Sequence, residues 1–170
     1  LHMAGAQQST PASLDNFYVI CPANAKLAHL IDFLGKHKES KVIVYFLPCA
    51  MVDYLEAVLP LVGDFGKHWI GALHGKQVHK RRTETYQDFV KRDSGVLLCT
   101  DVAARGLDIP DVDWIVQYDP PQDPKAFVHR VGRTARMGRR GASLVLLAPS
   151  EDAYVNFLAI RRVPCRAYYD

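Results

Sequence analysis

Hydrophobic positions along this chain alternate between short apolar runs and longer stretches with helical spacing. Residues 41–47 contain the apolar run Val42-Ile-Val-Tyr-Phe-Leu, which is typical of a strand buried on both faces of a sheet. In residues 25–37, leucine and isoleucine recur at helical spacing. Similar patterns predict further strands at 17–21, 68–73, 96–99, 112–117 and 142–147, and further helices at 51–59, 78–90, 124–132 and from a Ser150 cap to about residue 160. Strands alternating with helices at this pitch predict an α/β domain with an open parallel β-sheet and helices on both faces.

The length and composition fit one globular domain with short tails. The chain has 170 residues, 49% of them hydrophobic, which is enough for a single core. Residues 1–14 show no periodicity and begin with Leu1-His2-Met3, so we interpret them as a tag remnant followed by a linker or tail. Residues 15–163 are the predicted domain, and residues 164–170 are a predicted C-terminal tail.

Several classes of protein are disfavoured by the composition. No apolar run approaches the roughly 18 residues that cross a bilayer, and no signal peptide begins the sequence, so no membrane contact is expected. The four cysteines form no C-x-x-C pair, which disfavours a metal site and a disulfide framework. We interpret them as reduced thiols of an intracellular protein.

The richest chemical pattern is the run Phe127-Val-His-Arg-Val-Gly-Arg-Thr-Ala-Arg-Met-Gly138, in which three arginines recur at intervals of three. Asp123-Pro124 predicts that a helix begins just before it, because Asp is a good helix cap and Pro suits the first helical position. Guanidinium groups match phosphate oxygens well. For this segment alone, a solvated basic helix face is the alternative. A second basic cluster consists of Lys76, Lys80, Arg81 and Arg82.

Three polar segments follow predicted strands directly. They are His74-Gly75, Thr100-Asp101 and Asp119-Pro120-Pro121. Ligands of open α/β sheets bind outside the carboxyl ends of the strands, so these segments are predicted to meet at one ligand-binding edge. A threonine hydroxyl or a glycine amide there can donate to a nucleic-acid phosphate without reading a base. For Thr100-Asp101 in isolation, a turn or a helix cap is the alternative.

The groups that hydrolyse a nucleotide are not found in this sequence. A phosphate loop requires G-x-x-x-x-G-K-[ST], and the nearest run, Gly63-Asp-Phe-Gly-Lys-His68, is two residues short and ends in His. No Asp-Glu-Ala-Asp tetrad occurs either. We therefore expect the isolated chain not to hydrolyse ATP.

Taken together, the segments 73–82, 98–110 and 127–138 closely resemble the C-terminal half of a DEAD-box RNA helicase. The resemblance covers nearly everything from Phe17 to Leu158. Proteins of this family have two RecA-like domains, so it implies that this chain is a single RecA-like domain. It further implies that this domain closes with an N-terminal RecA-like domain over RNA and ATP, and that the N-terminal domain holds most of the ATP and the Mg²⁺.

The resemblance also assigns roles to single residues. Arg133 and Arg136 look like arginine fingers, which contribute roughly 10³–10⁵ in rate to phosphoryl transfer. ATP binding is expected to involve Gly106 and Asp108, the latter at the ribose. Closure contacts with the N-terminal domain are expected from Arg105, His129 and Arg130. Contacts with the RNA are expected from Gly75, His79, Arg82 and Thr100.

Three positions depart from the family pattern. Leu47-Pro48 stands where a small polar pair is usual, and neither residue can donate a hydroxyl to an RNA phosphate. His79 replaces the usual Gln, which introduces a titratable group. Ala135 replaces the commonest Gly between the last two arginines, which restricts the backbone there.

Within the family, three segments resemble the branch that acts in assembly of the large ribosomal subunit, which implies ribosomal RNA maturation in the nucleolus. They are Gln117-Tyr-Asp-Pro-Pro121, Phe127-Val-His-Arg130 and Asp152-Ala-Tyr-Val-Asn-Phe-Leu158. Helix-to-sheet packing explains the aromatic residues of the last segment equally well.

The resemblance implies a monomer that grips the RNA backbone without sequence preference, and a protein activator is a further expected partner. Two other functions stay open. The chain can be a stand-alone RNA-binding module without hydrolysis, or mainly a docking surface for a protein that activates a helicase. A translocase acting on DNA is a more distant alternative.

Overall fold

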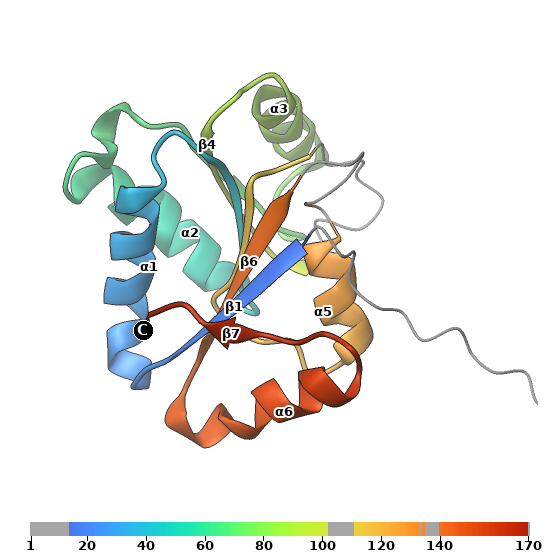
Figure 1. Ribbon diagram of the computed structural model, residues 1–170. Helices are drawn as coiled ribbons and strands as arrows, with labels where there is room; N and C mark the ends of the chain where they lie inside the picture. The colour runs from blue at the N-terminus through green and yellow to red at the C-terminus, as the bar shows by residue number, and fades with distance from the viewer. Residues whose placement is uncertain (1–13, 102–110, 133, 135–139, 170) are drawn as a thin grey trace, which may run out of the picture.

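The computed structural model describes residues 14–101, 111–132, 134 and 140–169 (Figure 1). In these ranges, seven strands form one parallel sheet in the order β3-β4-β2-β5-β6-β1-β7. The strands are β1 (Leu14–Ile20), β2 (Lys41–Tyr45), β3 (Ile70–Leu73), β4 (Gly95–Cys99), β5 (Trp114–Gln117), β6 (Gly141–Leu147) and β7 (Arg166–Ala167). The helices are α1 (Lys26–Lys36), α2 (Cys49–Val58), α3 (His79–Val90), α5 (Pro124–Val131) and α6 (Ala153–Ile160). The predicted α/β class with an open parallel sheet is confirmed.

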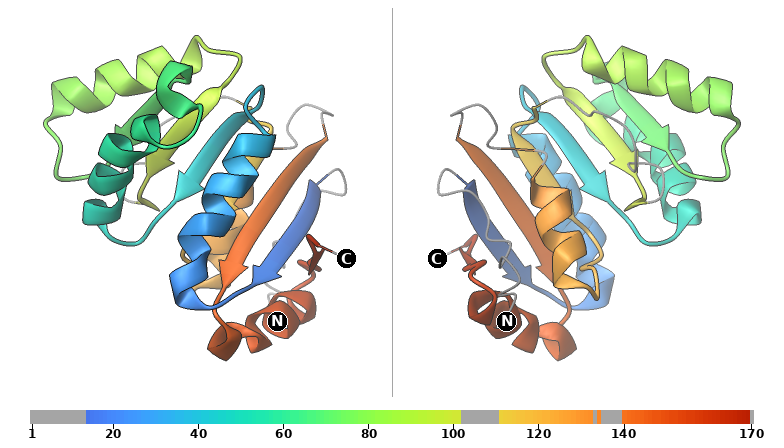
Figure 2. Two further views of the ribbon diagram at one scale, coloured as in Figure 1. Left: turned by 90° about the vertical axis from the view of Figure 1, so that its left-hand side faces the viewer. Right: turned by 90° about the vertical axis from the view of Figure 1, so that its right-hand side faces the viewer.

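Helices cover both faces of the sheet, because successive side chains of each buried strand point to opposite faces. On one face, Val42 and Val44 of β2 pack in a core with residues of α1 and α2. On the other face, Ile43 and Tyr45 pack in a second core with residues of α3, α5 and α6. Figure 2 shows α1 in front of the sheet in one view and α5 in front of it in the other. No helix in the described ranges has both the length and the apolar character to cross a bilayer.

Four predictions about the elements were wrong. β2 ends at Tyr45, and Leu47, which we placed in a buried strand, is 59% exposed. Ser150 does not cap the last helix, because it lies inside the short 3-10 helix Pro149–Glu151, where the Glu151 carboxylate accepts a hydrogen bond from the Ala148 N–H at 2.8 Å. Leu14 belongs to β1, and the segment expected to be a C-terminal tail carries β7, which pairs with β1.

The C-terminal segment is held by aromatic contacts beyond β7. The Tyr168 ring meets Phe17 and Phe33 edge-on, with centroids 5.7 Å away in both cases. Its hydroxyl lies 3.2 Å from Nε2 of His37, and the His37 ring in turn lies 4.3 Å from that of Phe33. These contacts tie the end of the chain to α1 and to β1.

Acid is expected to weaken the fold through His37. Burial lowers the pKa of His37 in the folded chain, and the Lys36 ammonium lowers it further. The unfolded chain therefore takes up a proton more readily, so the free energy of unfolding falls as the pH drops from the ordinary value of 6.5 to the lowered pKa of the folded state. Urea unfolding at about pH 7.5 and about pH 5.5 measures this loss. His37→Phe keeps a ring but cannot be protonated, so it should lose less stability than the wild type, and an equal loss would contradict the prediction.

Candidate functional site

The parallel register brings the predicted polar segments to one edge of the sheet. Tyr45 of β2 is paired with Cys99 of β4 and with Gln117 of β5, and Cys99 is paired with Leu73 of β3. Each of these residues is the last of its strand. The segments that follow them, at 46–48, 74–77, 100–101 and 118–121, therefore begin side by side. Their predicted meeting at the carboxyl edge is confirmed.

The loop between β3 and α3 is pinned by His74. The imidazole is 3% exposed, and its Nδ1 accepts a hydrogen bond from the Lys76 N–H at 3.2 Å. The ring proton therefore lies on Nε2, which donates to Oδ1 of Asp53 on α2 at 2.7 Å. Because one buried ring joins its own loop to a neighbouring helix, the backbone after β3 has little freedom to change its path.

Gln77 closes the same loop from its other end. Its side-chain oxygen accepts a hydrogen bond from the His74 N–H at 3.1 Å, and its amide nitrogen donates to the Ala72 carbonyl at 3.1 Å. Gly75 lies in the exposed turn between these anchors, and His79 is exposed at the first position of α3. The two predicted RNA-binding residues of this loop are thus presented to solvent on a fixed backbone.

Three buried side-chain atoms at this edge lack a hydrogen-bond partner in the described part of the chain. They are Oγ1 of Thr100, a residue that is 4% exposed, Nε of Arg82 and Nε2 of Gln117. Leaving a buried donor or acceptor unpaired costs about 1–3 kcal/mol, so such atoms in a folded domain call for an explanation. Thr100 and Arg82 were predicted to contact RNA from the sequence, and an incoming phosphate would supply the acceptor that these two lack.

Helix α5 begins as predicted, with the Asp123 carboxylate accepting a hydrogen bond from the Lys125 N–H at 2.9 Å. Near its end, the Arg130 side chain is buried, with 1% of its surface exposed, and its guanidinium makes four hydrogen bonds. Its Nε and one terminal nitrogen donate to the two carboxylate oxygens of Asp101, both at 2.7 Å. The other terminal nitrogen donates to Oε1 of Gln117 at 3.1 Å and to the Asp119 carbonyl at 2.7 Å. The guanidinium also lies over the Tyr45 ring, 5.1 Å from its centroid.

Arg130 was expected to take part in closure on another domain, and that expectation stays a prediction. Within this domain its donors already bind internal acceptors, since the buried charge needs an internal carboxylate. His129, the preceding residue, is exposed and stays available for the predicted closure contact. The remaining predicted positions, Arg105, Gly106, Asp108, Arg133 and Arg136, lie outside the described residues.

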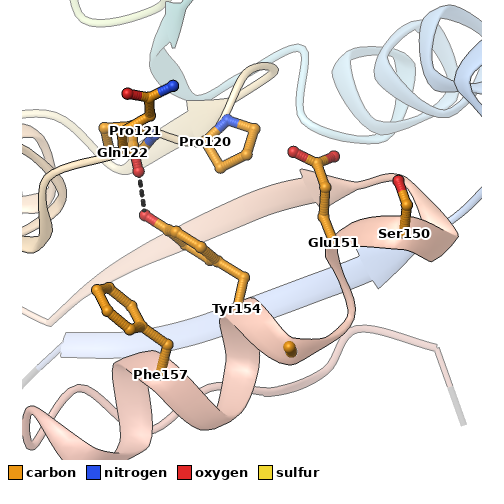
Figure 3. A pocket seen from close by; sticks show the side chains of 8 residues that line it. Pro120, Pro121, Gln122, Ser150, Glu151, Tyr154 and Phe157 are labelled. Atoms are coloured by element: carbon orange, nitrogen blue, oxygen red, sulfur yellow. Dashed lines mark hydrogen bonds between the residues drawn. The ribbon is translucent and has the colours of Figure 1, made fainter.

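An apolar groove of about 410 Å³ lies beyond the ends of β5 and β6 (Figure 3). Pro120 and Pro121 form one side, and Tyr154 and Phe157 of α6 form the other. The Tyr154 hydroxyl donates to the Pro121 carbonyl at 2.7 Å, as the dashed line in Figure 3 marks. Burial raises the pKa of Tyr154 well above its ordinary value, so the hydroxyl stays a neutral donor.

A family model described as the helicase conserved C-terminal domain matches residues 25–138, which is more than half of the chain. The chain belongs to this family. Its relatives identify it further as a helicase C-terminal domain of the DEAD-box type. It is 51% identical over 158 residues to a probable ATP-dependent RNA helicase ddx55 of Dictyostelium discoideum, and 47% identical over 159 residues to the human ATP-dependent RNA helicase DDX55.

This helicase C-terminal domain spans only about a quarter of the curated relatives it matches. The alignments cover 92% of the domain and 24% of the Dictyostelium protein, and 94% of the domain and 26% of the human one. Among solved structures, the C-terminal domain of the DEAD-box protein Dbp5 superposes with a TM-score of 0.79 at 27% identity, covering 91% of this chain and 89% of that one. Domain 2 of the DEAD-box helicase Mss116p, bound to an RNA duplex, superposes with a TM-score of 0.77 at 29% identity. This superposition covers 92% of this chain and 64% of that one.

Sequence reasoning missed several residues that shape the site of this DEAD-box domain. Asp53 and Gln77 hold the β3–α3 loop, and Asp101 and Gln117 hold Arg130. The sequence did contain a sign of a role for Asp101, since this residue directly follows Thr100 at the end of a strand. It contained no such sign for Asp53, which lies 21 residues before His74 in a segment that shows only helical periodicity.

Proposed function

We propose that this chain is the second RecA-like half of an ATP-dependent RNA helicase. It closes on an N-terminal RecA-like domain, supplies arginines to ATP and a phosphate-binding surface to RNA, and so separates RNA strands locally. The observation that carries the proposal is the edge where Thr100 and Arg82 keep unpaired polar atoms beside the pinned loop of Gly75. Two observations on similar proteins support it: relatives of this chain are named ATP-dependent RNA helicases, and domain 2 of Mss116p is seen bound to an RNA duplex.

On the RNA side, the proposed contacts go to the sugar-phosphate backbone. Thr100 and Arg82 offer a hydroxyl and a guanidinium, Gly75 offers exposed backbone, and His79 offers an exposed ring at the start of α3. None of these groups is arranged to distinguish one base from another, so binding is sequence-independent and weakens steeply with salt. Because one domain supplies only half of the phosphate contacts, the isolated chain binds RNA weakly.

On the ATP side, the proposed contributions are Arg133 and Arg136 as fingers on the γ-phosphate, with Gly106 and Asp108 at the nucleotide. His129 and Arg105 take part in closure. When bound, Mg²⁺ neutralises charge on the phosphates, and the carboxylates that hold it belong to the N-terminal domain. This chain's own part is to bring cationic side chains to the γ-phosphate as the two domains close.

The biological setting is proposed from the segments 117–121, 127–130 and 152–158, which resemble the branch acting in ribosome assembly. On this basis the protein matures ribosomal RNA in the nucleolus. The relatives come from eukaryotes, the organisms that have a nucleolus.

A strand-separation assay tests the proposed function. The full-length protein is mixed with a short RNA duplex, and release of one labelled strand is followed with ATP, without nucleotide, and with a non-hydrolysable analogue. Release that requires ATP and is suppressed by salt is the expected result. If the protein binds the duplex but ATP never releases a strand, the chain is an RNA-binding module and the helicase proposal fails.

Pro48→Thr in the two-domain protein is expected to tighten RNA binding several-fold with little change in ATP turnover. Pro48 is the cap residue of α2 with φ −86° and ψ 136°, and no side chain caps the helix there. Threonine fits this conformation, adds an N–H and a hydroxyl at the edge, and can cap α2, which is worth about 1 kcal/mol of stability. RNA titration and steady-state hydrolysis measure the two effects. Changed hydrolysis at unchanged RNA affinity would contradict the prediction.

A further inference from the structure

The turn after β3 is held by hydrogen bonds of two kinds, and those of the first kind lie within the turn itself. The Gln77 side chain binds the His74 N–H and the Ala72 carbonyl, both at 3.1 Å. The Lys76 N–H donates to Nδ1 of His74 at 3.2 Å. These bonds give the turn its shape, but they would stay intact if the whole turn tilted on the end of its strand.

Hydrogen bonds of the second kind join the turn to other elements. Nε2 of His74 donates to Oδ1 of Asp53 on α2 at 2.7 Å. One residue earlier, the Leu73 carbonyl accepts a hydrogen bond from the Thr100 N–H at 3.3 Å. The turn therefore adjoins the residue whose buried hydroxyl lacks a partner in the described ranges. The direction in which the exposed Gly75 points is set by α2 on one side and by the residue after β4 on the other.

Asp53 is poorly suited to bind RNA directly, because a carboxylate and a phosphate repel each other. Its side chain is 55% exposed, whereas that of His74 is 4% exposed. Since Nδ1 of His74 accepts a hydrogen bond, the ring proton lies on Nε2 and needs an acceptor outside the turn. Asp53 supplies that acceptor from α2. A turn that is held in place before RNA arrives loses little further freedom when RNA binds, which favours binding.

We propose that Asp53 is a positioning residue for RNA binding, which acts through His74 to fix the Gly75 turn beside Thr100. This rests on the proposed function and gives a role to an acidic residue that need not touch RNA. Charge alone predicts the opposite effect. Removing a carboxylate near an RNA-binding edge reduces repulsion and should tighten binding, whereas loss of positioning weakens it.

The test compares Asp53→Ala with Asp53→Asn in the full-length protein, by titration of a labelled single-stranded RNA with a non-hydrolysable ATP analogue present. Alanine removes the charge and the acceptor, whereas asparagine removes the charge and keeps an acceptor oxygen for His74. We expect Asp53→Ala to raise Kd about 5- to 10-fold, and Asp53→Asn to stay within about twofold of the wild type or bind more tightly. Wild-type or tighter binding by Asp53→Ala overturns the proposal, and so does binding by Asp53→Asn that is as weak as that of Asp53→Ala.

Glu56→Ala is the matched control. Glu56 lies on the same helix and accepts a hydrogen bond from Arg81 of α3 at 2.7 Å. Its removal takes the same charge from α2 but leaves the hydrogen bonds of the turn in place, so RNA affinity should be unchanged or slightly higher. A loss of affinity equal to that of Asp53→Ala would show that any acid removed from α2 weakens binding, and the positioning role would then be wrong.

Two further measurements separate positioning from a general loss of structure. Urea unfolding of each variant gives the folded fraction under assay conditions, and affinity is expressed per folded molecule. Hydrogen exchange of the peptide that contains Lys76 reports on the turn, because the Lys76 N–H is bonded to the ring that Asp53 holds. We expect faster exchange in Asp53→Ala than in the wild type, Asp53→Asn or Glu56→Ala. Unchanged exchange in Asp53→Ala contradicts the proposal.

The failure of this inference can be told from the failure of the proposed function. If the wild type does not bind RNA, the proposed function itself is wrong. If the wild type binds RNA, Thr100→Val weakens binding and Asp53→Ala does not, the RNA-binding surface stands and only the positioning role is overturned.

Discussion

Arg133→Ala in the two-domain protein is expected to lower RNA-stimulated ATP hydrolysis by about three to five orders of magnitude. As the γ-phosphate is transferred, negative charge builds on its oxygens, and a guanidinium pointing at them stabilises that charge more in the transition state than in the ground state. The loss should therefore appear in kcat, with only a small change in KM for ATP. Steady-state hydrolysis over a range of ATP concentrations at saturating RNA measures both.

Two control variants make this result specific. Arg133→Lys keeps a positive charge without the planar fork, so it should recover only part of the rate. Arg161→Ala removes an exposed arginine whose guanidinium lies over the Phe157 ring, 3.6 Å from its centroid, and should leave hydrolysis unchanged. If Arg133→Ala keeps more than about a tenth of the wild-type kcat, Arg133 is not a finger.

Asp101→Leu is expected to lower the free energy of unfolding of this domain by about 3–5 kcal/mol. The substitution leaves the Arg130 guanidinium buried with only neutral acceptors, those of Gln117 and Asp119. A buried charge that loses its partner keeps the cost of leaving water without the attraction that offset it. Because the Asp101 carboxylate is 35% exposed, water reaches part of the site, and the lower end of the range is expected. Urea unfolding of the isolated chain measures the change.

The matched control for Asp101→Leu is Glu56→Gln. Glu56 pairs with Arg81 at 2.7 Å, the same distance as in the Asp101–Arg130 pair. The Arg81 side chain is 53% exposed, however, so water screens the interaction and the expected cost is below about 1 kcal/mol. Equal costs in the two variants would show that burial does not decide the strength of the Arg130 contact.

The sequence predicted the layers of this fold well because parallel strands with helices on both faces have a strong signature. β2 and β4 are buried along their whole length, and after Lys41 and Gly95 their residues form continuous apolar runs. α5 was placed by Asp123 and Pro124, and the Asp123 carboxylate does cap the helix. The common edge of the polar segments followed from the parallel order of the strands alone.

Features that depend on distant partners were not predictable in this way. β7 is two residues long with both residues exposed, so it has no apolar pattern, and it exists because β1 offers it an edge to pair with. The interior position of Arg130 depends on a carboxylate 29 residues earlier in the sequence. In a basic run, an arginine that binds an internal Asp has the same local sequence as an arginine that faces a phosphate, so the sequence does not distinguish the two.

The central claim is that this chain completes an ATP site that it does not possess alone. The most direct test measures RNA-stimulated ATP hydrolysis by this chain, by the N-terminal RecA-like domain, and by the polypeptide that joins them. We predict hydrolysis only by the joined polypeptide, dependent on RNA and lost in Arg133→Ala. Hydrolysis by the isolated chain would contradict the account. So would a joined polypeptide whose hydrolysis is unchanged by Arg133→Ala.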